Sequence, residues 1–187
     1  AGVRIVTENH EFNEIYEKYK NAVLRAAYLY VKDPDIAEDI RQETFLKLLR
    51  LMECRKSASN VESWLYITAR NAALNYRKRV KWEVPLVQEE TGAPSGEPFR
   101  ESTEDEYLEM HTNEKWAELH DRIMSELLEK NERWYEAILL EAHMELPQKE
   151  AAKVMGISLN AYQVMLHRAR AWIREKFGAE YEELKRK

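Results

Sequence analysis

Apolar residues recur at helical spacing along most of the chain, and the first two such stretches flank a proline. The first stretch has its apolar positions at Phe12, Ile15, Tyr19, Val23, Ala26 and Tyr30. Steps of three or four residues place these side chains on one face of an α-helix. The helix is expected to end before Asp33, because Pro34 disfavours helical backbone in the residue that precedes it. Residues 1–10 carry no such pattern and are expected to form a loose terminus.

A second helix is predicted from about Asp35 to Met52, and Pro34 is well suited to its first turn. Its apolar positions are Ala37, Ile40, Thr44, Leu48 and Leu51. Away from this stripe, its first half carries Asp35, Glu38, Asp39, Gln42 and Glu43. Acidic side chains complement the dipole at a helix N-terminus, which accounts for Asp35 and Glu38. Phe45 and Leu46 lie beside the acids, and this mixture favours a docking surface.

A polar loop, residues 53–60, precedes a third helix of about residues 61–81, for which Ser59 or Asn60 is a suitable N-cap. One face is predicted to carry Trp64, Ile67, Asn71 and Leu74. A different face carries Tyr66, Arg70 and Arg77, and the helix ends in Arg77-Lys78-Arg79-Val80-Lys81-Trp82. Cations are favourable at any helix C-terminus, which is the simpler explanation of this end. Interleaved aromatic and basic residues are also typical of a surface that binds single-stranded nucleic acid.

Residues 114–130 and 132–145 each predict a helix that supports the C-terminal part of the chain. The apolar positions are Trp116, Leu119, Ile123 and Leu127 in the first helix, and Trp134, Ala137, Ile138 and Met144 in the second. Residues 179–187 form a charged tail that is expected to fray.

The stretch from Leu146 to Arg174 has the pattern of a helix-turn-helix. Gln148 to Met155 predicts a short helix with two small alanines, and Gly156 follows where a left-handed stop is needed. Ser158 is a suitable N-cap for a second helix. That helix has its apolar positions at Tyr162, Leu166, Ala169, Ile173 and Phe177. A tight turn that contains glycine between two helices is typical of DNA-binding proteins, although an ordinary helical hairpin shares the pattern.

Composition supports an all-α fold. Of 187 residues 44% are apolar, and only five are Gly and five Pro. Several of these lie between Pro85 and Pro98, which leaves long uninterrupted stretches of helix formers elsewhere. Cys54 is the single cysteine, which excludes an internal disulfide and suits a reducing cytoplasm. The sequence has no signal-peptide pattern and no apolar run of membrane-spanning length, so no membrane insertion is expected.

The net charge of −5 is unevenly distributed along the chain. Residues 1–84 contain 15 basic and 12 acidic groups, and residues 131–187 contain 10 and 9, whereas residues 85–130 contain 4 and 13. The excess of acid is confined to the middle, so the clustered cations of the two ends remain compatible with nucleic-acid binding. The Pro, Gly and acidic residues predict a flexible linker at residues 83–112. The two small helical domains that it joins are expected at residues 10–82 and 113–178.

The inventory of reactive residues argues against an enzyme. The five histidines are His10, His111, His120, His143 and His167, and none is spaced from another His or Cys as a metal-ligand pair. No Gly-rich loop for a phosphate and no motif for an activated Ser or Cys nucleophile is present in the sequence. We therefore expect no catalytic residue, no metal, no cofactor and no small-molecule substrate.

Three motifs together resemble a known family. The stretch from Asp35 to Leu46, DIAEDIRQETFL, resembles the core-polymerase-binding helix of bacterial sigma factors. The stretch from Ser63 to Asn71, continued by Tyr76 to Arg79, resembles their promoter-melting helix, and the helix-turn-helix resembles their domain for the minus-thirty-five element. The order is similar to that of the ECF (extracytoplasmic function) sigma factors, over about residues 10–82 and 112–177. The resemblance implies a protein that binds core RNA polymerase, directs it to promoters and helps to open the duplex.

The resemblance also implies roles for individual residues. The polymerase-binding set is Asp35, Glu38, Asp39, Gln42, Glu43 and Phe45. The set near the minus-ten DNA is Arg55, Lys56, Ser59, Asn60, Tyr66, Arg70, Asn71, Arg77, Lys78 and Arg79. The minus-thirty-five set is Ser158, Asn160, Ala161, Gln163, Val164, His167 and Arg168. Core RNA polymerase and promoter DNA are the expected partners, and an anti-sigma factor is a further candidate.

The recognition helix departs from the family pattern. Ala161, Gln163 and Met165 occupy positions where Thr, Lys and Arg are common, and Asn75 replaces a frequent Asp. The first three differences remove contacts to phosphate and guanine, and mildly favour an alternative, a sigma-like helix-turn-helix DNA-binding regulator without initiation activity. A helical protein with protein partners only is a third alternative, against which the basic Arg77–Lys81 cluster argues. The intact acidic helix favours a true sigma factor.

Overall fold

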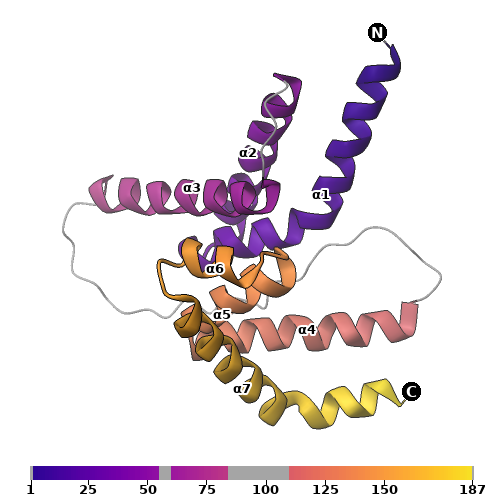
Figure 1. The fold of residues 1–187 in the computed structure, drawn as a ribbon, viewed down its shortest axis with the longest axis vertical. Coiled ribbons are helices and arrows are strands. Elements are labelled where there is room, and N and C mark those ends of the chain that lie inside the picture. The colour runs from indigo at the N-terminus through magenta and orange to yellow at the C-terminus, as the bar shows by residue number, and fades with distance from the viewer. Residues whose placement is uncertain (1, 55–59, 84–109, 187) are drawn as a thin grey trace.

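The computed structural model describes residues 2–54, 60–83 and 110–186, and every regular element within these ranges is a helix. In the N-terminal half, α1 (Gly2–Val31), α2 (Pro34–Glu53) and α3 (Val61–Glu83) pack together. The C-terminal half contains α4 (Met110–Lys130), α5 (Glu132–Ile138), a π-helical turn η1 (Leu139–His143), α6 (Gln148–Val154) and α7 (Leu159–Lys185) (Figure 1). The predicted all-α, two-domain architecture is confirmed.

Polar side chains define several of the helix starts. The Asp33 carboxylate accepts a hydrogen bond from the Ile36 amide at 3.0 Å, and Pro34 follows at the first helical position of α2. The Asn60 side chain accepts one from the Ser63 amide at 3.2 Å and caps α3. Each cap satisfies an amide that the helix itself leaves without an acceptor. Of the two predicted caps of α3, Asn60 is the one that the structure uses, while Ser59 lies outside the described residues.

Both predictions of loose ends were wrong. α1 begins at Gly2, because no proline and no internal glycine interrupts residues 3–31. α7 continues to Lys185, and α4 packs along its end. Glu180 pairs with Arg122 of α4, and the Tyr181 ring meets the Trp116 ring edge to face at 5.1 Å. Most of the predicted linker lies outside the described residues, but Met110 and the two residues after it already belong to α4.

The core of the N-terminal half confirms the stripes predicted for α1 and α2 and corrects the one predicted for α3. Tyr19 and Val23 of α1 and Ile40 and Leu48 of α2 are buried. The buried face of α3 is Leu65, Tyr66, Ala69 and Ala73. The face predicted to carry Trp64, Ile67, Asn71 and Leu74 is not the core face, because Ile67 is 41% exposed and Asn71 is exposed. The small alanines let α3 approach its neighbours closely, which the larger residues of the other face would prevent.

The helix-turn-helix forms as predicted. Gly156 has φ +67°, the left-handed conformation expected after α6. The Ser158 hydroxyl accepts a hydrogen bond from the Ala161 amide at 3.1 Å and caps α7. Tyr162 and Leu166 of α7 are buried, and the Tyr162 hydroxyl donates to the Ala137 carbonyl of α5 at 2.8 Å. This bond joins the recognition helix to the supporting helix beneath it.

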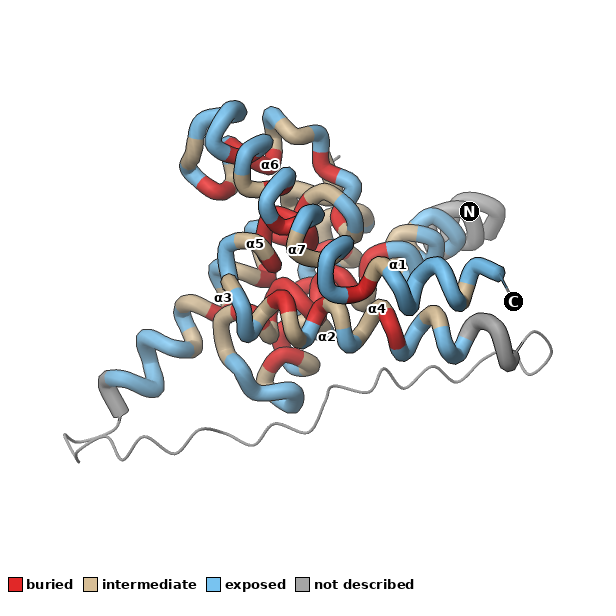
Figure 2. Tube along the Cα trace, turned by 90° about the horizontal axis from the view of Figure 1, so that it is seen from below, coloured by how far each residue is buried: buried red, intermediate tan, exposed pale blue. Residues whose placement is uncertain are grey.

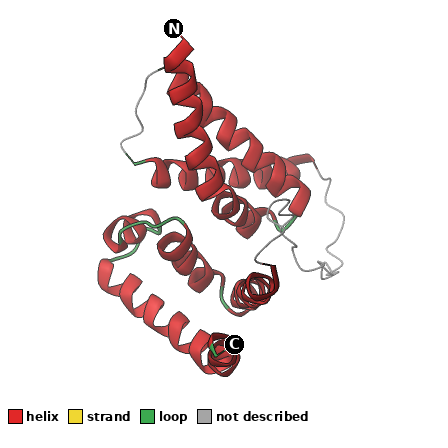
Figure 3. Ribbon diagram, turned by 90° about the vertical axis from the view of Figure 1, so that its right-hand side faces the viewer, coloured by secondary structure: helices red, strands yellow, loops and turns green. Residues whose placement is uncertain are grey.

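The two halves of the chain share one core. The cluster of buried apolar residues runs without interruption from α1 through α5 and η1 to α7. α1 contacts both α5 and η1, and α3 contacts α6. Figure 2 shows many of the buried residues gathered toward the centre of the molecule, and Figure 3 shows the helices of one half stacked on those of the other. The sequence pattern predicted two domains but did not predict this contact between them.

Candidate polymerase and nucleic-acid interfaces

The acidic surface of α2 is present largely as predicted. Asp35, Asp39, Gln42 and Glu43 are exposed. Glu38 is half-buried and accepts hydrogen bonds from Arg41 at 2.6 Å and from Gln42 at 3.1 Å. These bonds hold the Glu38 carboxylate in place on the helix surface.

Phe45 does not belong to this surface. It is 3% exposed, and its ring packs edge to face on Tyr16 at 4.8 Å and on Phe12 at 6.3 Å. The expected exposure of Phe45 was therefore wrong, because α2 buries a wider face against α1 than a single stripe. The next residue, Leu46, is 54% exposed and supplies the apolar element among the acids.

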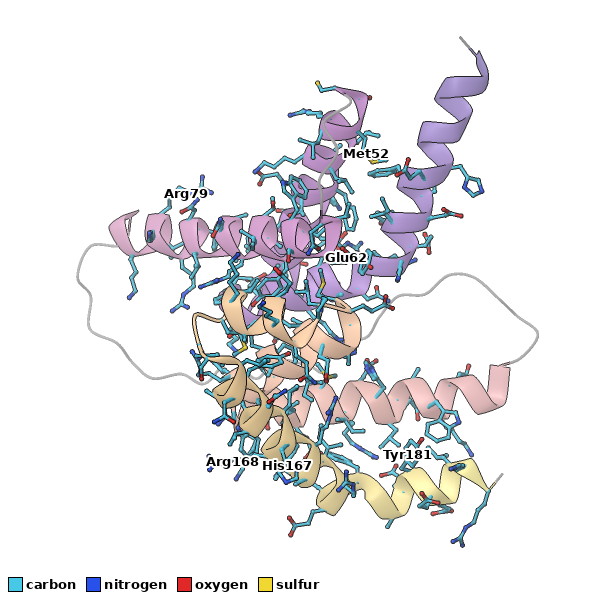
Figure 4. The ribbon with its side chains drawn as sticks, in the orientation of Figure 1. Met52, Glu62, Arg79, His167, Arg168 and Tyr181 are labelled. Atoms are coloured by element: carbon cyan, nitrogen blue, oxygen red, sulfur yellow. The ribbon has the colours of Figure 1, made fainter. Side chains whose placement is uncertain are left out.

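An open groove separates α2 from α3. Its walls carry Asp39 and Glu43 of α2 and Asn71, Asn75 and Arg79 of α3. Carboxylates therefore face amide and guanidinium groups across it. Figure 4 shows Arg79 toward the outer end of α3, which extends away from the rest of the molecule. Arg77, Lys78 and Arg79 are exposed, so this end of α3 presents concentrated positive charge to solvent.

The face of α3 predicted to bind single-stranded DNA is covered by the C-terminal half at Tyr66 and Arg70 and exposed to solvent at Arg77. Tyr66 is fully buried, and its hydroxyl donates to Glu136 of α5 at 2.6 Å. Arg70 is half-buried, and its Nη1 donates to the Val154 carbonyl at the end of α6 at 3.2 Å. The expectation that Tyr66 lies on an accessible stacking surface was wrong for this conformation, because α5 covers it. Burial and the neighbouring Glu136 carboxylate raise the pKa of Tyr66 well above its usual value, which keeps its hydroxyl a donor.

The loop that supplies Arg55, Lys56, Ser59 and Asn60 to the predicted minus-ten set is only partly described. Arg55, Lys56 and Ser59 lie outside the described residues. Asn60 is half-buried, and its side-chain oxygen already caps α3.

The first turns of α7 present the predicted minus-thirty-five residues. Asn160, Ala161, Gln163, His167 and Arg168 are exposed, and Val164 is 42% exposed. Ser158 serves as the cap instead of as a free side chain. In Figure 4, His167 and Arg168 project from the side of α7 that faces away from α1 to α3.

A shallow groove beside this helix contains two arginines outside the predicted set. Its walls include Gln148, Gln163, His167, Arg170 and Arg174. Gln163 donates to Gln148 at 3.1 Å, and Gln148 donates to Glu141 at 2.9 Å, while Arg170 pairs with the same Glu141. Arg170 and Arg174 follow His167 by one and two helical turns, a spacing that could have identified them. Glu141 neutralises part of this positive charge.

Two histidines meet on the supporting helices of the C-terminal half. The Nε2 atoms of His120 and His143 lie 2.7 Å apart, so one ring must donate and the other accept. Burial, His120 and Arg25 together lower the pKa of His143 from 6.5 to about 4. Among the described residues, no group of three or more His, Cys, Asp or Glu is placed to hold a metal ion. No helix in the same part of the chain is long and apolar enough to cross a membrane.

Comparisons with known proteins give the same assignment for both halves. The family model for Sigma-70 region 2 matches residues 15–83, and that for Sigma-70, region 4 matches residues 125–173. The chain is 30% identical over 158 residues to the ECF RNA polymerase sigma factor SigM of Bacillus subtilis, covering 84% of this chain and 90% of that protein. It is 25% identical over 171 residues to the RNA polymerase sigma factor YlaC of the same organism, covering 91% and 94%.

Two further relatives extend the comparison to another bacterium and to a solved structure. The ECF RNA polymerase sigma-E factor of Haemophilus influenzae is 28% identical over 166 residues, covering 88% of this chain and 86% of that protein. The sigma factor RpoE from Bartonella quintana, solved in complex with the anti-sigma factor NepR, has a similar fold. The TM-score is 0.57 at 20% identity, and the match covers 88% of this chain and 95% of that chain.

A helical domain with an acidic helix beside a basic one, followed by a helix-turn-helix domain, defines a two-domain sigma factor. The matches identify the family within this class: the chain belongs to the ECF RNA polymerase sigma factors. The family predicted from the sequence is therefore confirmed. So is its role in transcription initiation, with core RNA polymerase and promoter DNA as its partners.

Proposed function

We propose that the exposed acids of α2 bind core RNA polymerase and that α3 and α7 then deliver the complex to a promoter. The observation that carries this proposal is the surface formed by Asp35, Asp39, Gln42 and Glu43 around the exposed Leu46. Charged residues that surround an exposed apolar side chain suit a protein interface, in which complementary charge steers association. On this proposal the chain acts in the cytoplasm and is not itself an enzyme, because the polymerase supplies the bond-making chemistry.

The minus-ten DNA would contact the outer half of α3. Asn71, Arg77, Lys78 and Arg79 are exposed there, and the loop residues Arg55, Lys56, Ser59 and Asn60 precede the same helix. Cations hold phosphates without regard to sequence, and aromatic rings replace the stacking that a melted base loses. Tyr66 and Arg70 can take part only when the C-terminal half moves away from α3.

The minus-thirty-five element would meet the first turns of α7. The exposed set there is Asn160, Ala161, Gln163, Val164, His167 and Arg168, with Ser158 orienting the helix start. A recognition helix enters the major groove with its N-terminal residues toward the base edges. Asn160 and Gln163 carry amides that can pair with adenine, whereas Ala161 and Val164 can make only apolar contacts, for example with a thymine methyl group.

Binding to polymerase can be tested with the double variant Asp39→Arg and Gln42→Ala. Both residues are exposed, so the variant should fold, whereas a reversed charge in an interface costs several kcal/mol. We expect it to lose co-purification with core polymerase and to lose run-off transcription. Glu129→Arg, a charge reversal at an exposed acid on α4, is the control and should retain both. Undiminished polymerase binding by the folded double variant would refute the assignment of α2.

The alternative expected from the sequence was a regulator that binds DNA without initiating transcription, because Ala161, Gln163 and Met165 replace the Thr, Lys and Arg that are common in the family. The same run-off assay separates the two functions. A regulator would bind promoter DNA but leave purified core polymerase inactive. An initiation factor would make the transcript depend on added protein.

A protein that sequesters this chain is a further proposed partner. The Bartonella quintana RpoE of similar fold was solved in complex with an anti-sigma factor. A partner that covered α2 or α3 here would compete directly with polymerase or promoter DNA. Competition for core polymerase, measured with a candidate anti-sigma factor from the same genome, tests this.

A further inference from the structure

The contact between the two halves of the chain has a consistent distribution of charge. Among the described residues, each ion pair that crosses it has its cation on α1 or directly after it and its anion on the C-terminal half. The pairs are Lys18–Glu145 at 2.6 Å, Arg25–Asp121 at 2.6 Å and Lys32–Glu132 at 2.8 Å. The Lys18 and Lys32 pairs are exposed and individually weak, but Arg25 is 7% exposed. Breaking its pair would therefore cost more than breaking a surface pair.

A buried carboxylate fastens the centre of the same contact. Glu136 of α5 is 8% exposed, and its Oε1 accepts hydrogen bonds from Tyr66 of α3 at 2.6 Å and Tyr30 of α1 at 3.1 Å. The two tyrosine oxygens also lie 3.3 Å apart. We call Tyr30, Tyr66 and Glu136 the tyrosine–glutamate latch. A buried carboxylate needs hydrogen-bond donors to offset the loss of its hydration. Without the two tyrosine hydroxyls, burying Glu136 at this contact would therefore be unfavourable.

The contact also holds a residue of the proposed DNA surface in a poorly satisfied state. Arg70 donates from Nη1 to the Val154 carbonyl, and its Nε is buried with no hydrogen-bond partner among the described residues. A phosphate could accept two parallel hydrogen bonds from the same guanidinium. Arg70 therefore gains hydrogen bonds when it exchanges its contact with α6 for a DNA phosphate. The same opening breaks the hydrogen bonds from Tyr30 and Tyr66 to Glu136.

We propose that the tyrosine–glutamate latch and the ion pairs around it hold the free chain in a closed, self-inhibited conformation that covers Tyr66 and Arg70. Polymerase and promoter DNA shift the chain to the open conformation, because only that conformation exposes these two residues. A ligand can move such an equilibrium only by its preference for one state. The inhibitory consequence rests on the function proposed above for α3, whereas closure itself does not.

Closure can be measured on the chain of 187 residues alone, without a partner, by small-angle X-ray scattering. The double variant Tyr30→Phe and Tyr66→Phe keeps both rings and removes both hydroxyls. Losing two hydrogen bonds to a carboxylate should lower the ratio of closed to open chain by about a hundred-fold or more, seen as a larger radius of gyration. Tyr162→Phe is the matched control, because it removes a buried tyrosine hydrogen bond within the C-terminal half. It should stay as compact as the parent.

A second pair of variants tests closure without touching the core. Lys18→Glu with Lys32→Glu places like charges opposite Glu145 and Glu132, and should enlarge the chain at low salt. Adding Glu145→Lys and Glu132→Lys restores opposite charges and should restore the compact form. A parent chain that is already extended, or variants that all remain as compact as the parent, would overturn the proposal. None of these measurements involves polymerase, so they stand whether or not the α2 interface is correct.

Transcription assays then test inhibition. If the latch inhibits, the Tyr30→Phe and Tyr66→Phe variant reaches half-maximal transcript at a lower concentration than the parent. An opened variant with an unchanged requirement would overturn the inhibitory part of the proposal and leave closure itself intact.

Discussion

At the scale of single residues, burial decides which polar groups can serve a binding function. Tyr66 and Phe45 belong to motifs that resemble DNA- and polymerase-binding segments, yet both are buried in the closed chain. His143 is half-buried and has no counterpart in these motifs, but its environment makes it sensitive to acid. The chemical type of a residue therefore predicts its role only when its position in the fold is also known.

The low pKa of His143 predicts a loss of stability in acid. Burial, followed by His120 and Arg25, lowers its pKa from 6.5 to about 4, so the unfolded chain binds this proton more readily than the folded chain. The contribution of His143 is complete above pH 6.5 and is lost as the pH falls toward 4. The loss should be roughly 2–3 kcal/mol, since each pH unit of unequal proton binding is worth about 1.4 kcal/mol.

Urea unfolding followed by circular dichroism across this pH range measures the effect. His143→Gln should flatten the dependence of the unfolding free energy on pH between 6.5 and 4. His10→Gln, at an exposed position on α1, should leave it unchanged. Equal pH dependence in all three proteins would show that His143 is not responsible.

At the scale of single elements, two glycines of the C-terminal half should respond oppositely to alanine. Gly156 ends α6 with φ +67°, where alanine is strained although nothing lies within 4 Å of the added Cβ. Gly178 lies within α7, where the added Cβ would meet only the Arg174 Cγ at 3.7 Å. Gly156→Ala should lower the unfolding free energy by about 1 kcal/mol, and Gly178→Ala should raise it by roughly 0.5–1 kcal/mol. Thermal unfolding measures both, and a shift of the same sign in both would contradict the assigned conformations.

The basic end of α3 should matter more for opening promoters than for binding polymerase. Changing Arg77, Lys78 and Arg79 to Ala keeps a good helix and removes three exposed cations. The triple variant should still bind core polymerase but transcribe poorly from duplex promoters. It should recover partly on templates already mismatched across the minus-ten element, because these no longer require unpairing. Parental activity on duplex promoters would mean that the cluster is only a solvated helix end, and equal failure on both templates would indicate general DNA attachment.

Periodicity predicted the elements better than it predicted their faces. The helix-turn-helix, its cap at Ser158 and its stop at Gly156 follow from local chemistry that the sequence carries directly. The core face of α3 was missed because Ala69 and Ala73 are small, and the larger Trp64 and Ile67 outweighed them in the pattern. Phe45 was missed because α1 covers more of α2 than one stripe. Which face is buried depends on the neighbouring helices, and single-helix periodicity does not contain that information.

At the scale of the whole molecule, sequence patterns could not predict the contact between the two halves. Tyr66 and Glu136 are 70 residues apart, and neither carries a local signal of the other. The seven-residue spacing of Lys18, Arg25 and Lys32 becomes meaningful only after the helices are placed together, because their acidic partners come from three separate positions of the C-terminal half. Motif order predicted the family correctly, because each motif is local, whereas domain closure is a property of the assembled chain.

The free chain of 187 residues should bind duplex DNA weakly and with a shallow dependence on salt. Affinity for duplex DNA follows the number of phosphates that cations neutralise. The net charge is −5, Arg170 is paired with Glu141, and Arg70 faces Val154, so the duplex is left mainly with the exposed cations at the end of α3 and on α7. Fluorescence anisotropy with a labelled promoter duplex at several salt concentrations measures the slope. A slope that implies about eight or more phosphates would show that the closed chain exposes a much larger basic surface.

Arg168→Ala, at an exposed cation of α7, should reduce the slope by about one. Lys149→Ala, at an exposed cation of α6, is the control that tests whether any exposed cation has the same effect.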